Sequence, residues 1–163
     1  MRAKSGFTLV EILIVVVILG ILAAIVIPQF TSASSEAKLS ALRSDLQTVR
    51  SQIELYKIQH TDSLPGTTAG VDFVTAMTSK TDVYGNTGVG AAFKYGKYME
   101  SMPKNPYNDK GALPGEVLEA DTTPAAADNT YGWFYNKNPT ATDGGTFKAS
   151  DLNPTTGEHH WNE

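Results

Sequence analysis

A long apolar run near the start of the chain is its strongest pattern. From Phe7 to Phe30 the one charged residue is Glu11, and Arg2 and Lys4 stand just before the run. A helix of that length would measure about 36 Å, which exceeds the ~30 Å hydrocarbon core of a bilayer. The basic residues favour a cytoplasmic N-terminus. The pattern therefore predicts a membrane helix over residues 7–30, with the rest of the chain beyond the membrane.

Three interpretations of this run are open. A secretory signal peptide has an apolar region of about 7–15 residues, so the run is too long, although Thr31-Ser32-Ala33 could pass as a cleavage site. A plain membrane anchor fits the length but gives no reason for Glu11, because a carboxylate in mid-span costs roughly 2.5–3.5 kcal/mol. In a segment that is processed and retained, Glu11 would have a function. We favour this over a Glu11 that merely reaches the interface near a helix end.

A second helical pattern follows directly. Pro28 predicts a kink or a locally melted turn, with the alternative that it ends the membrane helix. Beyond it, apolar residues recur every three or four positions, as on one face of an amphipathic helix. These residues are Leu39, Leu42, Leu46, Val49, Ile53 and Tyr56. The stripe is shorter than a coiled coil needs. We therefore expect residues 31–64 to continue the helix and to end by Leu64-Pro65-Gly66.

The composition changes after the helix. Gly, Pro, Asn, Asp and Thr dominate residues 65–163, which predicts a loop-rich head. Asp72 could cap a short helix, and residues 115–120, 130–135 and 146–149 are expected strands. We expect an α+β fold, in which a long helix packs on a small antiparallel meander of three or four strands. Its predicted core is Leu46, Val49, Ile53, Phe73, Met77, Tyr98, Met102, Trp133, Tyr135 and Phe147.

Composition and charge give little support to other functions. The 163 residues carry a net charge of −4, so nucleic acid is not an expected partner. The chain has no cysteine, which excludes a disulfide framework and thiol chemistry. Its histidines, His60, His159 and His160, lack partners at catalytic or zinc-ligand spacing. The glycine-rich stretch 85–90 lacks the flanking strand and helix of a phosphate loop. We therefore do not expect an enzyme.

The N-terminal residues resemble a known family. Gly6-Phe7-Thr8-Leu9-Val10-Glu11 followed by an Ile/Val/Leu-rich run is similar to the processing site of type IV pilins and of type II secretion pseudopilins. The resemblance implies that prepilin peptidase removes residues 1–6 by cutting between Gly6 and Phe7, and that Phe7 is then N-methylated. It also implies that Glu11 meets the new amine of a neighbouring Phe7 during subunit assembly. Paired between subunits, the two charges would offset each other's cost in lipid.

Later segments resemble the major-pseudopilin branch of the family. They are residues 51–57 with Leu64-Pro65, the proline-containing stretch 98–107 and the aromatic stretch 131–135. The resemblance implies a pilin-like head and a homopolymeric filament, the pseudopilus, that drives protein export. Implied partners are prepilin peptidase, an inner-membrane assembly platform and minor pseudopilins. The implied location is the bacterial inner membrane, with the N-terminus in the cytoplasm and the head in the periplasm.

Alternative functions are a surface type IV pilus subunit for adhesion, motility or DNA uptake, and a membrane-anchored binding module. An anchored binding module should tolerate Glu11→Leu, whereas a filament subunit should lose assembly.

Calcium is a further question that the resemblance raises. Members of the major-pseudopilin branch often bind calcium in a C-terminal loop, and Asp143, Asp151 and Glu158 could supply oxygen ligands here. However, Asn153-Pro154-Thr155-Thr156-Gly157 stands where an acidic, glycine-rich pattern would be expected. Aspartates scattered in loops usually form turns. We therefore expect no cofactor and commit to no metal site, with Asp143 and Asp151 as weak calcium candidates.

Overall fold

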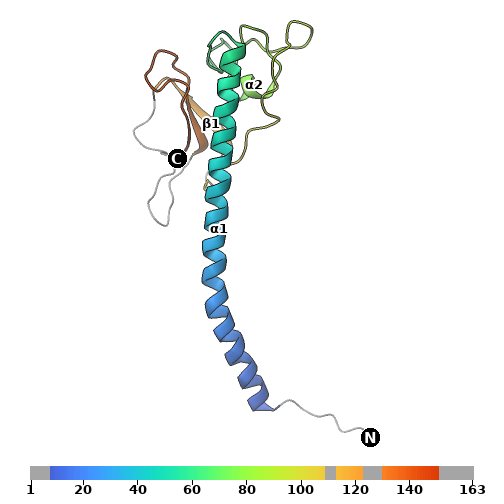
Figure 1. The fold of residues 1–163 in the computed structure, drawn as a ribbon, viewed down its shortest axis with the longest axis vertical. Coiled ribbons are helices and arrows are strands. Elements are labelled where there is room, and N and C mark those ends of the chain that lie inside the picture. The colour runs from blue at the N-terminus through green and yellow to red at the C-terminus, as the bar shows by residue number, and fades with distance from the viewer. Residues whose placement is uncertain (1–7, 109–112, 123–129, 151–163) are drawn as a thin grey trace. The chain divides into compact units, whose positions relative to one another are not determined.

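The computed structural model describes residues 8–108, 113–122 and 130–150. It contains helices α1 (Leu9–Gln59) and α2 (Phe73–Thr78) and strands β1 (Leu113–Ala120), β2 (Tyr131–Asn136) and β3 (Phe147–Ala149) (Figure 1). The chain divides into two units, Met1–Lys38 and Leu39–Glu163. A long helix followed by a small sheet confirms the predicted α+β, pilin-like fold class.

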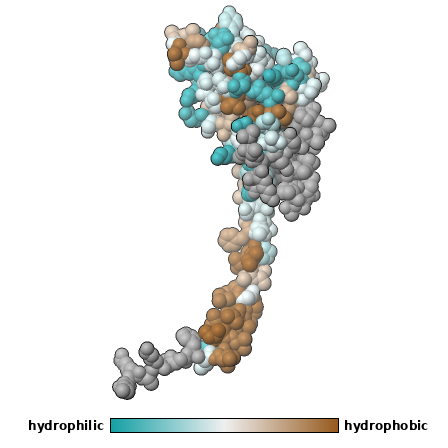
Figure 2. Space-filling view, turned by 180° about the vertical axis from the view of Figure 1, so that it is seen from behind, coloured by the Kyte–Doolittle hydropathy of each residue, from teal (hydrophilic) through white to brown (hydrophobic). Residues whose placement is uncertain are grey.

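The first unit contains the apolar part of α1. Its large apolar side chains are exposed from Leu9, at 81%, to Phe30, at 74%, and they form the continuous brown surface in Figure 2. The helix runs through Pro28, so the alternative that this proline ends the helix is wrong. Hydroxyl groups of Thr31 and Ser32 donate to the Pro28 carbonyl, at 2.8 and 3.1 Å. These bonds accompany a helix that continues past the proline.

The second unit begins with the amphipathic part of α1. Five residues of the predicted stripe are buried, namely Leu42, Leu46, Val49, Ile53 and Tyr56. The helix ends at Gln59, where Thr61 and Asp62 adopt positive φ angles of 54° and 65°. The Asp62 N–H then donates to the Lys57 carbonyl at 2.9 Å. A left-handed backbone of this kind commonly closes a helix by satisfying its last carbonyls.

The short helix α2 forms where the sequence predicts it. Asp72 is its N-cap, and the Oδ1 atom accepts a hydrogen bond from the Thr75 N–H at 2.8 Å. Phe73 and Met77 on this helix are completely buried. The Phe73 ring lies 4.2 Å from that of Tyr135 and 5.6 Å from that of Phe147, measured between centroids. The cap therefore holds a residue at the centre of the head.

The sheet corrects one part of the prediction. Its order is β1-β2-β3, with β2 antiparallel to β3 but parallel to β1, so the all-antiparallel meander is wrong. The eight residues of β1 extend about 26 Å. The ten residues between Ala120 and Tyr131 can span roughly 33–36 Å. This connection is long enough to return the chain to the starting edge of β1, so that β2 runs in the same direction.

The predicted core is confirmed. Nine of its ten members are buried, and Met102 is half-buried against the cluster. Trp133 has no exposed surface, and its Nε1–H donates to the Pro103 carbonyl at 2.8 Å. Asn105 and Asn108 donate side-chain N–H groups to the Gly132 and Tyr131 carbonyls. These bonds attach the proline-containing loop to β2.

Candidate assembly site on helix α1

The first turn of α1 holds its carboxylate in a capping box. The Oε2 atom of Glu11 accepts hydrogen bonds from the backbone N–H and the hydroxyl of Thr8, both at 3.0 Å. The Glu11 N–H donates in return to the Thr8 hydroxyl at 3.3 Å. Such reciprocal bonds satisfy backbone donors that a helix start leaves unpaired. The side chain of Glu11 is therefore already oriented along the first turn of α1.

Sequence reasoning identified Glu11 but missed Thr8. The signal was present, because Thr8-Leu9-Val10-Glu11 has the spacing of a capping box, in which a hydroxyl residue precedes an acidic residue by three positions. Gly6 and Phe7, the predicted cleavage and methylation residues, lie outside the described residues. The pairing of Glu11 with the amine of a second Phe7 thus stays a prediction.

Next to this capping box, the surface of α1 is apolar. A shallow groove of about 500 Å³ is lined by Thr8, Leu9, Ile12, Leu13 and Val16. The helix is long and apolar enough to cross a membrane, and the side chains of its most apolar stretch are not buried within the protein. A contiguous apolar surface of this size marks a membrane or protein contact. This part of α1 can therefore bury its side chains in lipid or against other helices.

Asp143, one of the weak calcium candidates, forms hydrogen bonds within the head. Asp143 lies between β2 and β3, where its Oδ1 atom accepts a hydrogen bond from the Asn136 side-chain amide at 3.0 Å. Its carbonyl accepts hydrogen bonds from the N–H and hydroxyl of Thr146. No group of three His, Cys, Asp or Glu side chains arranged to hold a metal occurs among the described residues. Asp151 and Glu158 lie outside those residues.

His60 belongs to the core of the head. It is completely buried and stacks on Tyr56, with ring centroids 3.8 Å apart. Its Nδ1 atom lies 2.8 Å from the Tyr56 carbonyl, and Nε2 lies 2.9 Å from the Thr81 hydroxyl. A buried imidazole whose two nitrogens both have hydrogen-bond partners stabilises packing. His159 and His160 lie outside the described residues.

Comparisons with known proteins match both the N-terminal motif and the head. Residues 1–27 match the family described as "Prokaryotic N-terminal methylation motif". The type II secretion system core protein G of Pseudomonas aeruginosa is 34% identical over 139 residues, covering 78% of this chain and 92% of that protein. The protein of the same name from Aeromonas hydrophila is 29% identical, covering 74% and 80%.

The relative from Vibrio cholerae, also named type II secretion system core protein G, is 29% identical and covers 81% of this chain and 86% of its own length. No solved structure matches the chain at a significant level. The matches to core protein G extend far beyond residues 1–27, which the methylation-motif family covers. The chain therefore belongs to the family of type II secretion system core protein G.

Proposed function

We propose that this protein is a structural subunit of a type II secretion pseudopilus. In this proposal, prepilin peptidase cuts between Gly6 and Phe7, and Phe7 is methylated at its new amine. The mature subunit is held in the inner membrane by α1 and is then polymerised into a filament that drives protein export. Membership of the core protein G family supports this proposal. The observation that carries it is an exposed apolar helix with a single carboxylate in its first turn.

The physical argument begins with the exposed side chains of α1. Apolar surface of this extent is strongly unfavourable in water, whereas lipid and a bundle of similar helices both cover it. A subunit can therefore leave the membrane for a filament without exposing α1 to water. Between helices in lipid, polar groups contribute association energy because hydrocarbon offers them no partner. Glu11 is the ionisable group on this surface.

Glu11 would supply the specific contact between subunits. Both Thr8 bonds reach Oε2, and a carboxylate can accept several hydrogen bonds. The Oε1 atom can therefore accept a bond from the Phe7 amine of a second copy while the capping box persists. Removing one partner of such a pair in lipid leaves an uncompensated charge. Assembly should thus be more sensitive to Glu11 than membrane insertion is.

The proposed topology places the N-terminus in the cytoplasm and the head in the periplasm. Arg2 and Lys4 support it, since basic residues are retained on the cytoplasmic side. In the proposed assembly, the partners are prepilin peptidase, the inner-membrane assembly platform, minor pseudopilins and further copies of this chain. No reaction is assigned to the protein itself.

The decisive experiment is N-terminal sequencing and intact mass of the membrane-extracted protein from its own host. We expect a chain that starts at Phe7 and carries one added methyl group. A chain starting at Met1 would contradict processing, and one starting near Ser34 would make the run a signal peptide. Glu11→Gln should abolish filaments while leaving membrane insertion intact. Glu36→Gln, which removes a charge outside the apolar part of α1, is the matched control.

A further inference from the structure

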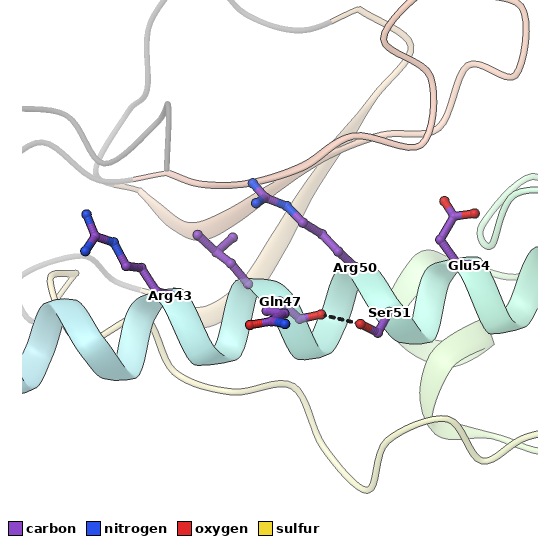
Figure 3. Close-up of a pocket in the computed structure, with 6 residues that line it drawn as sticks. Arg43, Gln47, Arg50, Ser51 and Glu54 are labelled. Atoms are coloured by element: carbon purple, nitrogen blue, oxygen red, sulfur yellow. Dashed lines mark hydrogen bonds between the residues drawn. The ribbon is translucent and has the colours of Figure 1, made fainter.

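Exposed large apolar side chains in the second unit occur in two places among its described residues. The first is the α1 patch, formed by Leu55 and Ile58, and Ile58 is 79% exposed. Residues three positions apart on a helix lie side by side. In the preceding turn, the Ser51 hydroxyl donates to the Gln47 carbonyl at 2.8 Å (Figure 3). This hydroxyl is satisfied within α1, so a partner can cover Ser51 together with the patch without breaking a hydrogen bond.

The second place is the loop between α2 and β1. Its exposed apolar side chains are Tyr84 and Val89. Val89 is 93% exposed, and every residue from 88 to 92 is exposed and uncharged. The Phe93 N–H donates to the Gly90 carbonyl at 3.1 Å. A Cβ on Gly88 would lie 2.5 Å from the Phe93 ring, so glycine allows this ring to close the turn. Val89 therefore projects from a defined turn, which we call the Val89 turn.

Neither surface covers the other within one chain, because both are exposed in the folded head. Removing apolar side chains from water is favourable, so each surface gains from a partner. A filament supplies further copies of the same chain at fixed positions. Its subunits meet through two different surfaces, since a contact between two identical surfaces stops at a dimer. The α1 patch and the Val89 turn are two different apolar surfaces on one head.

The charges beside the two surfaces are opposite. With His60 neutral, residues 54–62 contain one base and two acids, a net charge of −1 from Glu54, Lys57 and Asp62. Residues 80–94 contain two bases and one acid, a net charge of +1 from Lys80, Asp82 and Lys94. The Asp82 carboxylate already accepts N–H groups of its own turn, whereas both lysines are exposed. Complementary charges favour contact of an α1 patch with a Val89 turn over contact between two like surfaces.

We propose that the Val89 turn of one copy packs on the α1 patch of another copy, with Val89 against Leu55 and Ile58. The inference rests on the proposed function, because it needs a filament in which copies lie side by side. Each chain carries both surfaces, so the contact repeats along the filament instead of closing into a dimer. It adds a contact between heads to the burial of the apolar part of α1. The charged rim fixes the register of the contact, and the apolar side chains are its centre.

Cysteine cross-linking of the full chain in filaments sheared from its own host tests this contact. The natural chain has no cysteine, so introduced thiols form its only disulfides. Ile58→Cys combined with Val89→Cys gives every copy both halves of the contact. After mild oxidation, we expect a ladder of dimers, trimers and longer products on a non-reducing gel. The matched control combines Ile58→Cys with Ala69→Cys, because Ala69 is exposed on a different loop of the head.

We expect the ladder to form at least roughly tenfold faster than in the control, because a disulfide needs Cα atoms within about 7 Å. Adding Glu11→Gln should remove the ladder together with the filaments. Filaments without a ladder, equal rates for the control pair, or a dimer from either single cysteine variant would overturn this contact and leave the filament role intact. A cysteine-free chain that forms no filaments would overturn the proposed function, and this contact with it.

Charge substitution provides a second test that does not depend on disulfide formation. Both side chains are exposed, so Ile58→Glu and Val89→Lys should leave the fold of the head unchanged. Each single variant should lower the amount of filament several-fold, because it places a charge opposite an apolar surface. The two substitutions together should restore filaments, since the new charges can pair directly. Failure of the double variant to recover beyond both single variants would contradict direct contact.

Discussion

At the residue scale, the orientation of Glu11 depends on Thr8. Glu11 is the one charge in the apolar run, yet its carboxylate already has two hydrogen-bond donors from Thr8 within the same turn. Intramolecular capping lowers the cost of holding the charge near lipid, because part of its lost hydration is replaced. It also limits the rotamers from which Glu11 can reach a second subunit. Thr8 is therefore a positioning residue in the proposed assembly.

Thr8→Val should weaken assembly without abolishing it. Valine keeps the shape but removes the hydroxyl that donates to Oε2 and accepts from the Glu11 N–H, and loss of such a cap costs about 0.5–2 kcal/mol. We expect the variant to form fewer filaments than the natural protein but more than Glu11→Gln. The measurement is the amount of this protein in filaments sheared from the cells. Thr8→Ser should restore it. Thr31→Val, which removes another hydroxyl from α1, is the control, and an equal loss there would contradict a specific role for Thr8.

At the element scale, one carboxylate caps α2 and a second, on β1, joins it to the sheet. Asp72 caps the helix, and the Glu119 Oε1 atom on β1 accepts the Phe73 N–H at 2.6 Å. The other Glu119 oxygen lies 3.7 Å from the Lys137 ammonium group. Phe73 is the residue that both contacts position, and its ring packs against those of β2 and β3. Substitution of either carboxylate should thus alter the stability of the whole head.

Asp72→Ala should destabilise the head. It removes the acceptor of the Thr75 N–H, which costs about 1 kcal/mol at an N-cap. For a domain of this size, we expect the Tm to fall by roughly 3–4 °C. The measurement is thermal unfolding of the full chain in detergent, followed by near-ultraviolet circular dichroism from the buried aromatic residues. Asp72→Asn should retain most of the stability, since asparagine caps nearly as well. An equal loss in both variants would contradict the capping role.

The pH dependence of stability should reflect Glu119. Burial raises the pKa of its carboxyl, against the opposing effects of the Phe73 N–H and Lys137. The folded state therefore binds this proton more tightly than the unfolded state does. The contribution of Glu119 is full below its unfolded pKa and is lost as pH rises through the folded pKa. Because glutamine keeps an acceptor for Phe73 without a charge to desolvate, Glu119→Gln should raise the Tm at pH 7.

At pH 3 the carboxyl is protonated in both states, so the difference between Glu119→Gln and the natural protein should disappear. Glu116→Gln on the same strand is the control, because Glu116 is exposed and should alter the Tm little at either pH. A lower Tm for Glu119→Gln at pH 7 would mean that the ion pair with Lys137 outweighs the cost of burying the carboxylate.

At the scale of the whole molecule, local patterns predicted elements better than they predicted contacts between them. The stripe from Leu42 to Tyr56 and the cap at Asp72 depend on neighbours within one or two turns, so sequence reasoning identified both. The parallel pairing of β1 with β2 depends on the route of a connection, which alternation of side chains does not encode. The burial of His60 depends on Thr81, 21 residues away. Such long-range contacts are properties of the assembled head.

The packing of the whole head also determines the expected effect of metal removal on its stability. The head has a continuous aromatic and aliphatic core, and Asp143 uses a carboxylate oxygen to hold the buried Asn136 amide. In addition, residues 153–157 lack the acidic, glycine-rich pattern expected of a calcium loop. We therefore expect the Tm of the full chain to be the same in EDTA and in excess calcium. A fall in EDTA that Asp143→Asn or Asp151→Asn removes would instead identify the substituted aspartate as a calcium ligand.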